Sequence, residues 1–238
     1  FPVEVIDEPV RGRGRARNTA WRHCRTPFIA FTDADCTVSV SWLKELMPAF
    51  EDPGIAIVGG DIVTPGDDVL ARFFELRQIV SNLEFSGDYP YSPPFLATAN
   101  AVFRISAIEA VSGFQENYRV AEDADICWRI TAMGYHIRYT PNAFVFHHHR
   151  TTVAQLFRQA VDYGHDGVHV ILTFRPEIRF WIWSGLYFRW MIAFAKLPLS
   201  PFFRSQFTRK LPVLDLIRYS GLILGRLSAA WETRRFII

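Results

Sequence analysis

The chain has 238 residues, of which 50% are hydrophobic, 15% aromatic and 21% charged. These proportions exclude a disordered or collagen-like chain, and the length suffices for one large domain or two small ones with a buried core. The formal net charge of +2 gives no reason to expect a nucleic-acid partner.

The first 150 residues alternate between strand and helix patterns. Residues 3–6 predict a short strand and 16–24 a helix, and the apolar run 27–32 is typical of a buried parallel strand. Ser39 is the expected N-cap of a helix that ends near residue 50. The later elements are strands over 55–63, 100–105, 135–139 and 143–147, helices over 68–85, 106–111 and 122–133, a loop over 88–95, and a turn at Pro141 and Asn142. This alternation predicts an α/β sheet.

The last third of the chain differs in charge and composition. Residues 178–238 hold ten Lys and Arg residues against two acidic ones, a balance of +8 that leaves −6 for residues 1–177. Thr152 is expected to cap an amphipathic helix. Residues 180–195 are almost wholly apolar, but this segment is shorter than the roughly 20 residues that span a bilayer.

We therefore expect a domain over 1–150 and a helical extension over 151–238. Trp, Tyr and Arg side chains within the apolar segment favour a helix that lies in a membrane surface, and residues 211–227 repeat this character. A buried helical subdomain and a face that binds a partner protein are the alternatives.

The cysteines and histidines differ in their potential as metal ligands. Cys24, Cys36 and Cys127 form no C-x-x-C pair, so neither a disulfide scaffold nor a structural zinc site is expected, and a reducing compartment is the simpler interpretation. Three successive histidines end the last strand, and alternation puts His147 and His149 on one face, which suggests a metal or phosphate site. A second pair, His165 and His169, has the spacing of a zinc helix but lacks a third ligand.

Two charged segments suggest ligand chemistry. Asp33 and Asp35 follow the strand 27–32, where ligands of open α/β sheets bind, and two such carboxylates suit a hard divalent cation that also contacts phosphate oxygens. Four arginines around two glycines in residues 11–17 precede a helix and form either an anion site or a solvated basic loop.

The acidic segment 122–125 allows two interpretations. Acidic residues at the start of a helix stabilise the positive end of its dipole. Alternatively, one carboxylate faces a cleft as a general base, while Arg129 orients or neutralises another. The residues alone favour the first interpretation.

Taken in order, these segments resemble an inverting family 2 glycosyltransferase of the GT-A fold. The resemblance covers about residues 3–175. It is carried by the segments 15–20 (RARNTA), 28–35 (FIAFTDAD), 99–104 (ANAVFR), 113–114 (GF), 122–129 (EDADICWR) and 134–147. The implied fold is, more specifically, an α/β fold with a mixed, mostly parallel sheet flanked by helices.

The resemblance implies a role for each donor-side residue. Asp33 would face the nucleotide ribose, and Asp35 would coordinate Mn²⁺ or Mg²⁺ bound to the donor's diphosphate. His147 matches the family's metal-binding histidine, with His149 as an alternative on the same face. Arg17 would support the nucleotide side of the site.

The remaining implied roles concern the sugar and the acceptor. Asp123 would be the base that takes the proton of the acceptor hydroxyl, and Glu122 and Asn100 would contact the nucleotide-sugar, with residues 97–100 lining the donor-sugar and acceptor pocket. The implied activity is transfer of a sugar to a carbohydrate or lipid-linked acceptor in polysaccharide or glycolipid synthesis. The expected location is peripheral, at the cytoplasmic face of a membrane.

One departure from the family pattern leads to a further expectation. The family begins with two strand–helix units that recognise the nucleotide base, whereas this sequence opens at the equivalent of the third strand. We therefore expect a fragment with little activity by itself.

Two other functions fit the same residues. A non-catalytic, membrane-associated remnant would bind a partner through its aromatic C-terminal helices and would not depend on Asp35. A metal-dependent phosphohydrolase would use Asp33, Asp35 and the histidines, without an acceptor and without Asp123.

Overall fold

The computed structural model describes residues 3–85, 93–148, 151–174 and 179–232. The chain divides into two compact units. The sheet unit comprises 1–63 and 80–147, and the helical unit comprises 64–79 and 148–238. Residues 64–79, which the sequence assigns to the first domain, therefore group with the C-terminal helices.

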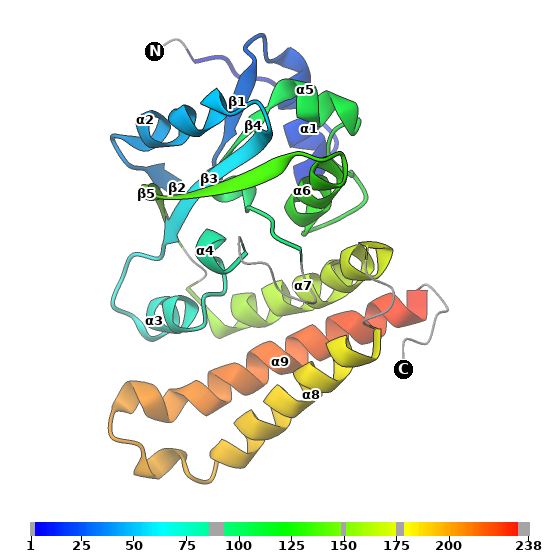
Figure 1. The fold of residues 1–238 in the computed structure, drawn as a ribbon. Coiled ribbons are helices and arrows are strands. Elements are labelled where there is room, and N and C mark those ends of the chain that lie inside the picture. The colour runs from blue at the N-terminus through cyan, green and yellow to red at the C-terminus, as the bar shows by residue number, and fades with distance from the viewer. Residues whose placement is uncertain (1–2, 86–92, 149–150, 175–178, 233–238) are drawn as a thin grey trace. The chain divides into compact units, whose positions relative to one another are not determined.

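The sheet unit is built on a five-stranded sheet with the order β1-β4-β3-β5-β2 (Figure 1). Its strands are β1 (Phe28–Phe31), β2 (Cys36–Val38), β3 (Ile55–Val63), β4 (Ala101–Arg104) and β5 (His136–His147). β3 pairs in parallel with β5, whereas β1–β4, β3–β4 and β2–β5 pair antiparallel. The mixed α/β fold is confirmed, but fewer pairings are parallel than predicted. The apolar run 27–32 predicts a buried parallel strand, but β1 stands at the end of the sheet order, pairs antiparallel and buries only Phe31. Apolar composition alone therefore determines neither the direction of its neighbour nor the depth of its burial.

Helices cover this sheet and complete its core. They are α1 (Arg13–His23), α2 (Trp42–Leu46), α4 (Asn82–Phe85), α5 (Ile105–Ala110) and α6 (Glu122–Ala132), with the 3-10 turns η1 (Met47–Glu51) and η2 (Thr98–Asn100). Leu46, Val58 and Val102 are fully or almost fully buried in one core cluster. The rings of Phe31 and Phe103 meet edge to face at 5.7 Å.

Several local predictions differ from the structure. Residues 3–6 form no strand pairing among the described residues. α2 is short, and its N-cap is Ser41 and not the predicted Ser39. The buried hydroxyl of Ser39 has no hydrogen-bond partner in the described part of the chain. The predicted helix 68–85 is two helices, α3 (Val69–Leu76) and α4, because Gln78 between them has a φ of 47° that an α-helix cannot contain. The predicted loop 88–95 lies outside the described residues except for 93–95.

β5 is one strand with a bulge, where the sequence predicts two strands and a turn. Gly60 pairs with Thr140 and Ile62 with Val145, so residues 141–144 stand opposite a single residue of β3. Proline cannot donate to the ladder and is tolerated at bulges, which agrees with Pro141 at this point.

Gly60 and Asn100 hold the bulge in place. A Cβ atom at position 60 would lie 1.5 Å from the carbonyl oxygen of Ala143, so only glycine fits. The Nδ2 group of Asn100 donates to the carbonyl oxygens of Asp61 (2.7 Å) and Ala143 (2.8 Å), and its Oδ1 accepts from the indole of Trp42 (2.7 Å). Asn100 is fully buried. It therefore satisfies backbone groups that the bulge removes from the ladder.

The helical unit consists of helices that pack at close range. They are α3 (Val69–Leu76), α7 (Val153–Phe174), α8 (Arg179–Lys196) and α9 (Gln206–Glu232), with the turn η4 (Ser200–Phe202). α7 and α8 both run beside α9 (Figure 1). Cβ atoms at Gly164 and Gly225 would lie 2.2 Å and 2.0 Å from carbonyl oxygens of the opposite helix, so glycine permits this approach of α7 and α9. The predicted cap of α7 is confirmed, because the backbone N–H of Gln155 donates to Thr152 Oγ1 at 3.2 Å.

None of the helices in the described part of the chain has the length and apolar character needed to cross a membrane.

Because Asn100 holds the bulge in place, removal of its side chain should lower the stability of the fold considerably. Asn100→Ala leaves two carbonyls and one indole N–H buried without partners, at about 1–3 kcal/mol each, so we expect the free energy of unfolding to fall by about 3–5 kcal/mol. Urea unfolding followed by circular dichroism measures this loss. Asn142→Ala on the exposed bulge is the matched control, and equal effects of the two substitutions would contradict the assignment.

Candidate functional site

Arg17 brings together three parts of the sheet unit. Its side chain leaves α1 and is only 12% exposed. Nη2 donates to Asp33 Oδ1 at 3.1 Å, just beyond β1, and Nη1 donates to Oε1 of Glu122 in the first turn of α6. Three of the residues that the resemblance assigns to nucleotide-sugar binding therefore lie in direct contact.

The buried carboxylate of Glu122 requires the ion pair with Arg17. Its side chain is 2% exposed, and a buried carboxylate is costly unless a cation pairs with it. Its second oxygen, Oε2, is buried and accepts no hydrogen bond from any described residue. Arg17 is thus the cation that permits a carboxylate at this position.

Asp123 follows in the same turn of α6 and is half-buried. Burial, with a further contribution from the negative charge of Glu122, raises the pKa of Asp123 to about 7, against the opposing effect of Arg17. A carboxyl group that titrates near neutral pH can both accept and release a proton under physiological conditions. This is the protonation behaviour that a general base requires.

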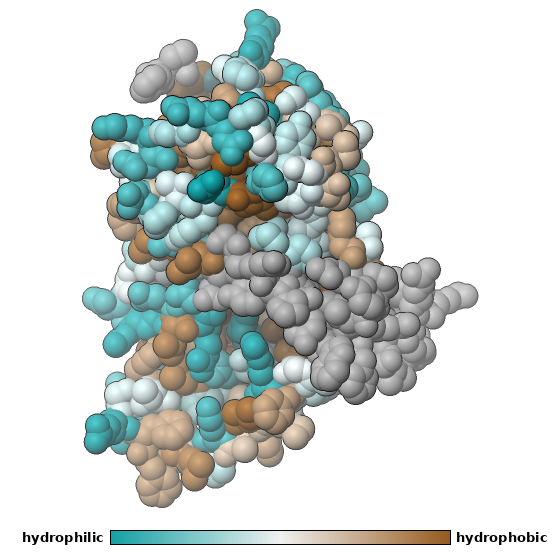
Figure 2. Space-filling view, in the orientation of Figure 1, coloured by the Kyte–Doolittle hydropathy of each residue, from teal (hydrophilic) through white to brown (hydrophobic). Residues whose placement is uncertain are grey.

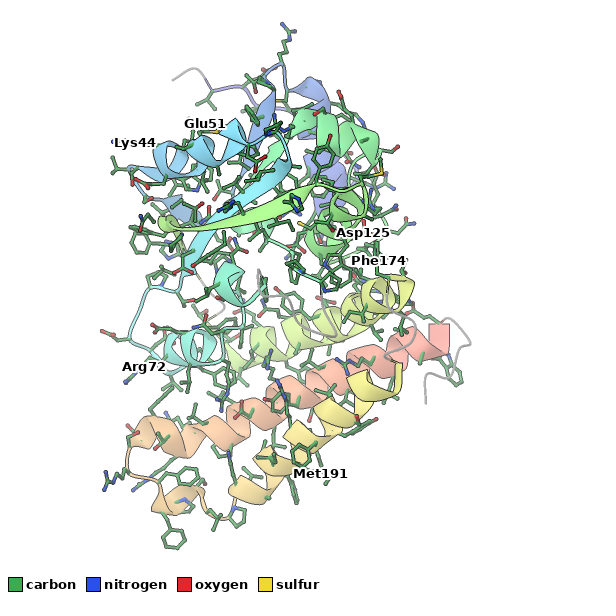
Figure 3. All side chains as sticks on the ribbon, in the orientation of Figure 1. Lys44, Glu51, Arg72, Asp125, Phe174 and Met191 are labelled. Atoms are coloured by element: carbon green, nitrogen blue, oxygen red, sulfur yellow. The ribbon has the colours of Figure 1, made fainter. Side chains whose placement is uncertain are left out.

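Asp125 has a different role from its neighbours (Figure 3 labels it on α6). Arg129 donates from Nε at 2.8 Å and from Nη2 at 2.5 Å to Asp125 Oδ2. The same guanidinium donates to the carbonyl oxygens of Val111 and Gly113 after α5. Arg129 neutralises Asp125, as the functional interpretation of this segment proposes, and joins α6 to the end of α5.

A second group lies where β2 meets β5. Cys36 is the cross-strand partner of His147, and Asp35 directly precedes Cys36. Nε2 of His147 lies 3.6 Å from Oδ1 of Asp35. The ligating atoms of the three residues all lie within 4.8 Å of one another, and among the described residues this is the one such group of three or more potential metal ligands.

The donor set fits a divalent cation held by Asp35 and His147. Carboxylate and imidazole groups are ligands for Mn²⁺, and Mg²⁺ also takes carboxylates and phosphate oxygens. The Asp35 side chain is 40% exposed, so one side of such an ion would remain open to a ligand. Burial, followed by the charges of Asp33 and Asp35, raises the pKa of the Cys36 thiol to about 11. The protonated thiol is a poor ligand for a hard cation.

The other predicted residues lie in different surroundings. Asn100 uses both N–H groups to hold the bulge, which gives it a scaffolding role beneath the strands. The arginine-rich segment 11–17 is helical from Arg13 onward and is not a loop. His149 lies outside the described residues.

The His165 and His169 pair belongs to the helical unit. His165 contacts carboxylates through both ring nitrogens, Nδ1 with Asp166 at 2.5 Å and Nε2 with Glu232 at 3.0 Å. Burial lowers the pKa of His169. These contacts tie α7 to the end of α9 and account for the histidine without a metal.

The sequence did not indicate that Cys36 lies beside the predicted metal ligands Asp35 and His147. The sequence shows no strand signal after Asp35, because β2 has only three residues. Its pairing with a strand more than 100 positions away is not visible in a local pattern.

Comparisons with known proteins agree with this geometry. Residues 28–227 match the family model described as glycosyl transferase family group 2. A pre-mycofactocin glycosyltransferase of Mycobacterium tuberculosis is 36% identical over 68% of this chain and 36% of its own length. An O-antigen chain rhamnosyltransferase of Salmonella anatum is 27% identical over 68% of this chain and 54% of its own length. The chain thus matches between about a third and a half of the length of these relatives.

A solved structure shares the fold. It is a mannosyltransferase from Pyrobaculum calidifontis in complex with GDP-Man and Mn²⁺, and it is 20% identical to this chain. The similarity has a TM-score of 0.60 and covers 94% of this chain and 68% of the mannosyltransferase chain. The GT-A fold expected from the sequence is therefore confirmed.

Loss of the Arg17 cation should destabilise the sheet unit. Arg17→Met leaves the buried Glu122 carboxylate unpaired, and we expect the free energy of unfolding to fall by about 3–5 kcal/mol. The double variant Arg17→Met/Glu122→Gln should recover much of this loss, because the uncompensated charge is gone. Urea unfolding of all three proteins provides the measurement.

Arg15→Met is the matched control on the same helix. Arg15 forms a more exposed pair with Glu116 at 3.0 Å, which should contribute at most about 1 kcal/mol. If Arg17→Met and Arg15→Met cost the same, the central place of the Arg17 pair is wrong.

Proposed function

Because the chain belongs to glycosyl transferase family group 2, we propose that its sheet unit takes part in transfer of a sugar from a nucleotide-sugar to an acceptor hydroxyl, with a divalent cation and with inversion at the anomeric carbon. The observation that carries the proposal is that Asp33 and Asp35, two residues apart, belong to two different groups of side chains. Asp33 contacts Arg17, which also contacts Glu122 beside Asp123, whereas Asp35 lies 3.6 Å from His147.

The donor is assigned to the side of Asp33 and Asp35. Arg17 engages one oxygen of Asp33, and the 38% exposed side chain can offer its other oxygen to a ribose hydroxyl. A Mn²⁺ or Mg²⁺ ion held by Asp35 and His147 would supply positive charge to the departing diphosphate. The GDP-Man and Mn²⁺ named for the similar mannosyltransferase structure support this assignment.

Asp123 is assigned to the acceptor. The acceptor oxygen forms a bond to the anomeric carbon, the bond from that carbon to the diphosphate oxygen breaks, and the hydroxyl proton passes to Asp123. A single displacement of this kind inverts the anomeric configuration. The pKa of about 7 for Asp123 supports the role, because a large fraction of the carboxylate is ready to accept a proton at neutral pH.

We propose a carbohydrate or lipid-linked acceptor in polysaccharide or glycolipid synthesis. The names O-antigen chain rhamnosyltransferase and poly-β-1,6-N-acetyl-D-glucosamine synthase, which belong to two similar proteins, support polysaccharide synthesis. We place the reaction at the cytoplasmic face of a membrane, with the protein peripheral to it.

Asp123→Asn tests the general base. We expect the transfer rate to fall by about 10²–10⁴-fold while donor affinity stays nearly unchanged, because the base acts on the acceptor alone. The rate of the unsubstituted protein should drop as the pH falls below about 7, where Asp123 becomes protonated. Both measurements use protein expressed from the complete reading frame, with a radiolabelled donor. Transfer that survives Asp123→Asn would contradict the assignment.

The same substitution should change stability in a pH-dependent way. The folded pKa of Asp123, about 7, lies above its ordinary value of 3.8, so the native state holds a proton that the unfolded chain has released, and stability falls as pH rises between these values. Asp123→Asn should therefore raise the melting temperature at about pH 8 and have little such effect at about pH 4. Thermal melts at the two pH values separate this effect from a loss of folding.

Asp35→Ala and His147→Ala test the cation site. Each removes one proposed ligand, and we expect Mn²⁺-dependent binding of the donor to weaken at least about tenfold. Calorimetry with a panel of GDP-, UDP- and dTDP-sugars, with and without Mn²⁺, gives the affinities. Cys36→Ala is the matched control, because the protonated thiol should contribute nothing to the ion.

These experiments also separate the competing functions. A non-catalytic remnant would bind no sugar nucleotide in the presence of Mn²⁺, and Asp35→Ala would change nothing. A phosphohydrolase would release product without an acceptor and would keep its rate after Asp123→Asn.

A further inference from the structure

The end of the helical unit where α8, η4 and α9 follow one another has an exposed apolar surface. Met191 and Phe194 on α8 are 57% and 58% exposed, and Leu199 and Phe202 around η4 are 54% and 84% exposed (Figure 3 labels Met191). Figure 2 shows hydrophobic and hydrophilic residues side by side over this end of the helices. We name these four residues the apolar tip.

The opposite face of α8 is firmly packed. Leu186 and Ala193 are buried against Tyr219 of α9. The Trp190 indole donates to Ser220 Oγ at 3.0 Å and stacks on Phe194 with ring centroids 5.6 Å apart. Because this face already has its partner, Met191 and Phe194 of the apolar tip lie on a side of α8 that the described helical unit leaves uncovered.

Exposed cations lie near the apolar tip. Lys196, Arg204, Arg209 and Lys210 are exposed in the same stretch of chain. Arg209 donates to the carbonyl oxygen of Phe203 at 3.0 Å. Neither Lys196 nor Arg204 forms an ion pair or a side-chain hydrogen bond with any residue that the structure describes. The positive charge of this surface is therefore largely uncompensated.

A cavity of about 470 Å³ lies beside the tip, and its polar lining is mainly cationic. Asp215 contributes the acid, but Arg77 already engages both of its oxygens, from Nε at 2.8 Å and from Nη2 at 2.5 Å. Lys196 and Arg204 line the same cavity and have no anionic partner among the residues that the structure describes. The rest of the wall consists of Thr208 and the apolar residues Phe202, Phe203, Leu211 and Pro212.

We propose that this surface docks on an anionic phospholipid bilayer, with a headgroup phosphate in the cavity between Lys196 and Arg204. Exposed apolar side chains with cations near them can bind a lipid surface. The apolar groups enter the boundary of the acyl chains, and the cations contact the negative headgroups. The cavity also suits a lipid headgroup. Lys196 and Arg204 can bind its phosphate, and the rings of Phe202 and Phe203 form an apolar wall beside it. The helices lie in the membrane surface and do not cross it. This inference rests on the peripheral membrane location of the proposed function, but it does not depend on the sugar-transfer chemistry.

Vesicle flotation of the whole chain tests the proposal. We expect binding to vesicles of phosphatidylcholine mixed with phosphatidylglycerol, weaker binding at high salt, and little binding to phosphatidylcholine alone. Phe194→Ser/Phe202→Ser and Lys196→Gln/Arg204→Gln should each lower the partition coefficient about tenfold or more, because one removes the apolar and the other the electrostatic contribution.

Matched controls come from the sheet unit. Val40 and Arg25 are exposed there, and Val40→Ser/Arg25→Gln should bind vesicles as the unsubstituted chain does. All substituted side chains are exposed, and thermal melts verify that each variant is folded. Absence of binding to phosphatidylglycerol vesicles, equal binding to phosphatidylcholine alone, or full binding by either double variant would overturn the proposal.

Discussion

The candidate site depends on one cation, the guanidinium of Arg17. It stands among the carboxylates of Asp33, Glu122 and Asp123, and it is the positive charge that lowers the pKa of Asp123 against burial and the neighbouring acid. With less positive charge, Asp123 would stay protonated at neutral pH; with more, it would be too weak a base. The position of Arg17 on α1 therefore links the start of the chain to the proposed chemistry at the start of α6.

The proposed cation site depends on a backbone irregularity. The bulge in β5 inserts residues 141–144 before the strand resumes pairing, and the resumed strand carries His147 opposite Cys36 and next to Asp35. Glycine at position 60 makes room for the bulge, and the buried amide of Asn100 satisfies its carbonyls. A shift of one residue would turn His147 to the other face of the sheet. Asn100 thus acts on the site by fixing the strand register and not by touching a ligand.

Local patterns and long-range pairing account for what the sequence could and could not predict. β3 has the predicted bounds, 55–63, because a continuous apolar run ended by turn residues is a local signal. Asp33, Asp35 and Asp123 were found because they follow a strand or begin a helix, and the family resemblance gave them roles. β2, the bulge and Cys36 were missed because they arise from pairing between distant segments. The role of Asn100 was also hidden, since a sequence motif does not show whether a polar side chain faces a ligand or the backbone.

The division of charge along the chain has a structural basis in these two units. In the sheet unit, Arg17 and Arg129 pair with carboxylates, whereas in the helical unit Lys196 and Arg204 have no acidic partner among the described residues and lie beside the aromatic rings of Phe202 and Phe203. α8 buries one face against α9 and exposes the other, so its apolar residues serve two different surfaces. A helix that crosses a membrane needs apolar residues on every face, whereas a helix that lies in the surface needs them on one outer face alone. The aromatic content of the C-terminal region is therefore consistent with the absence, among the described helices, of one able to cross a membrane.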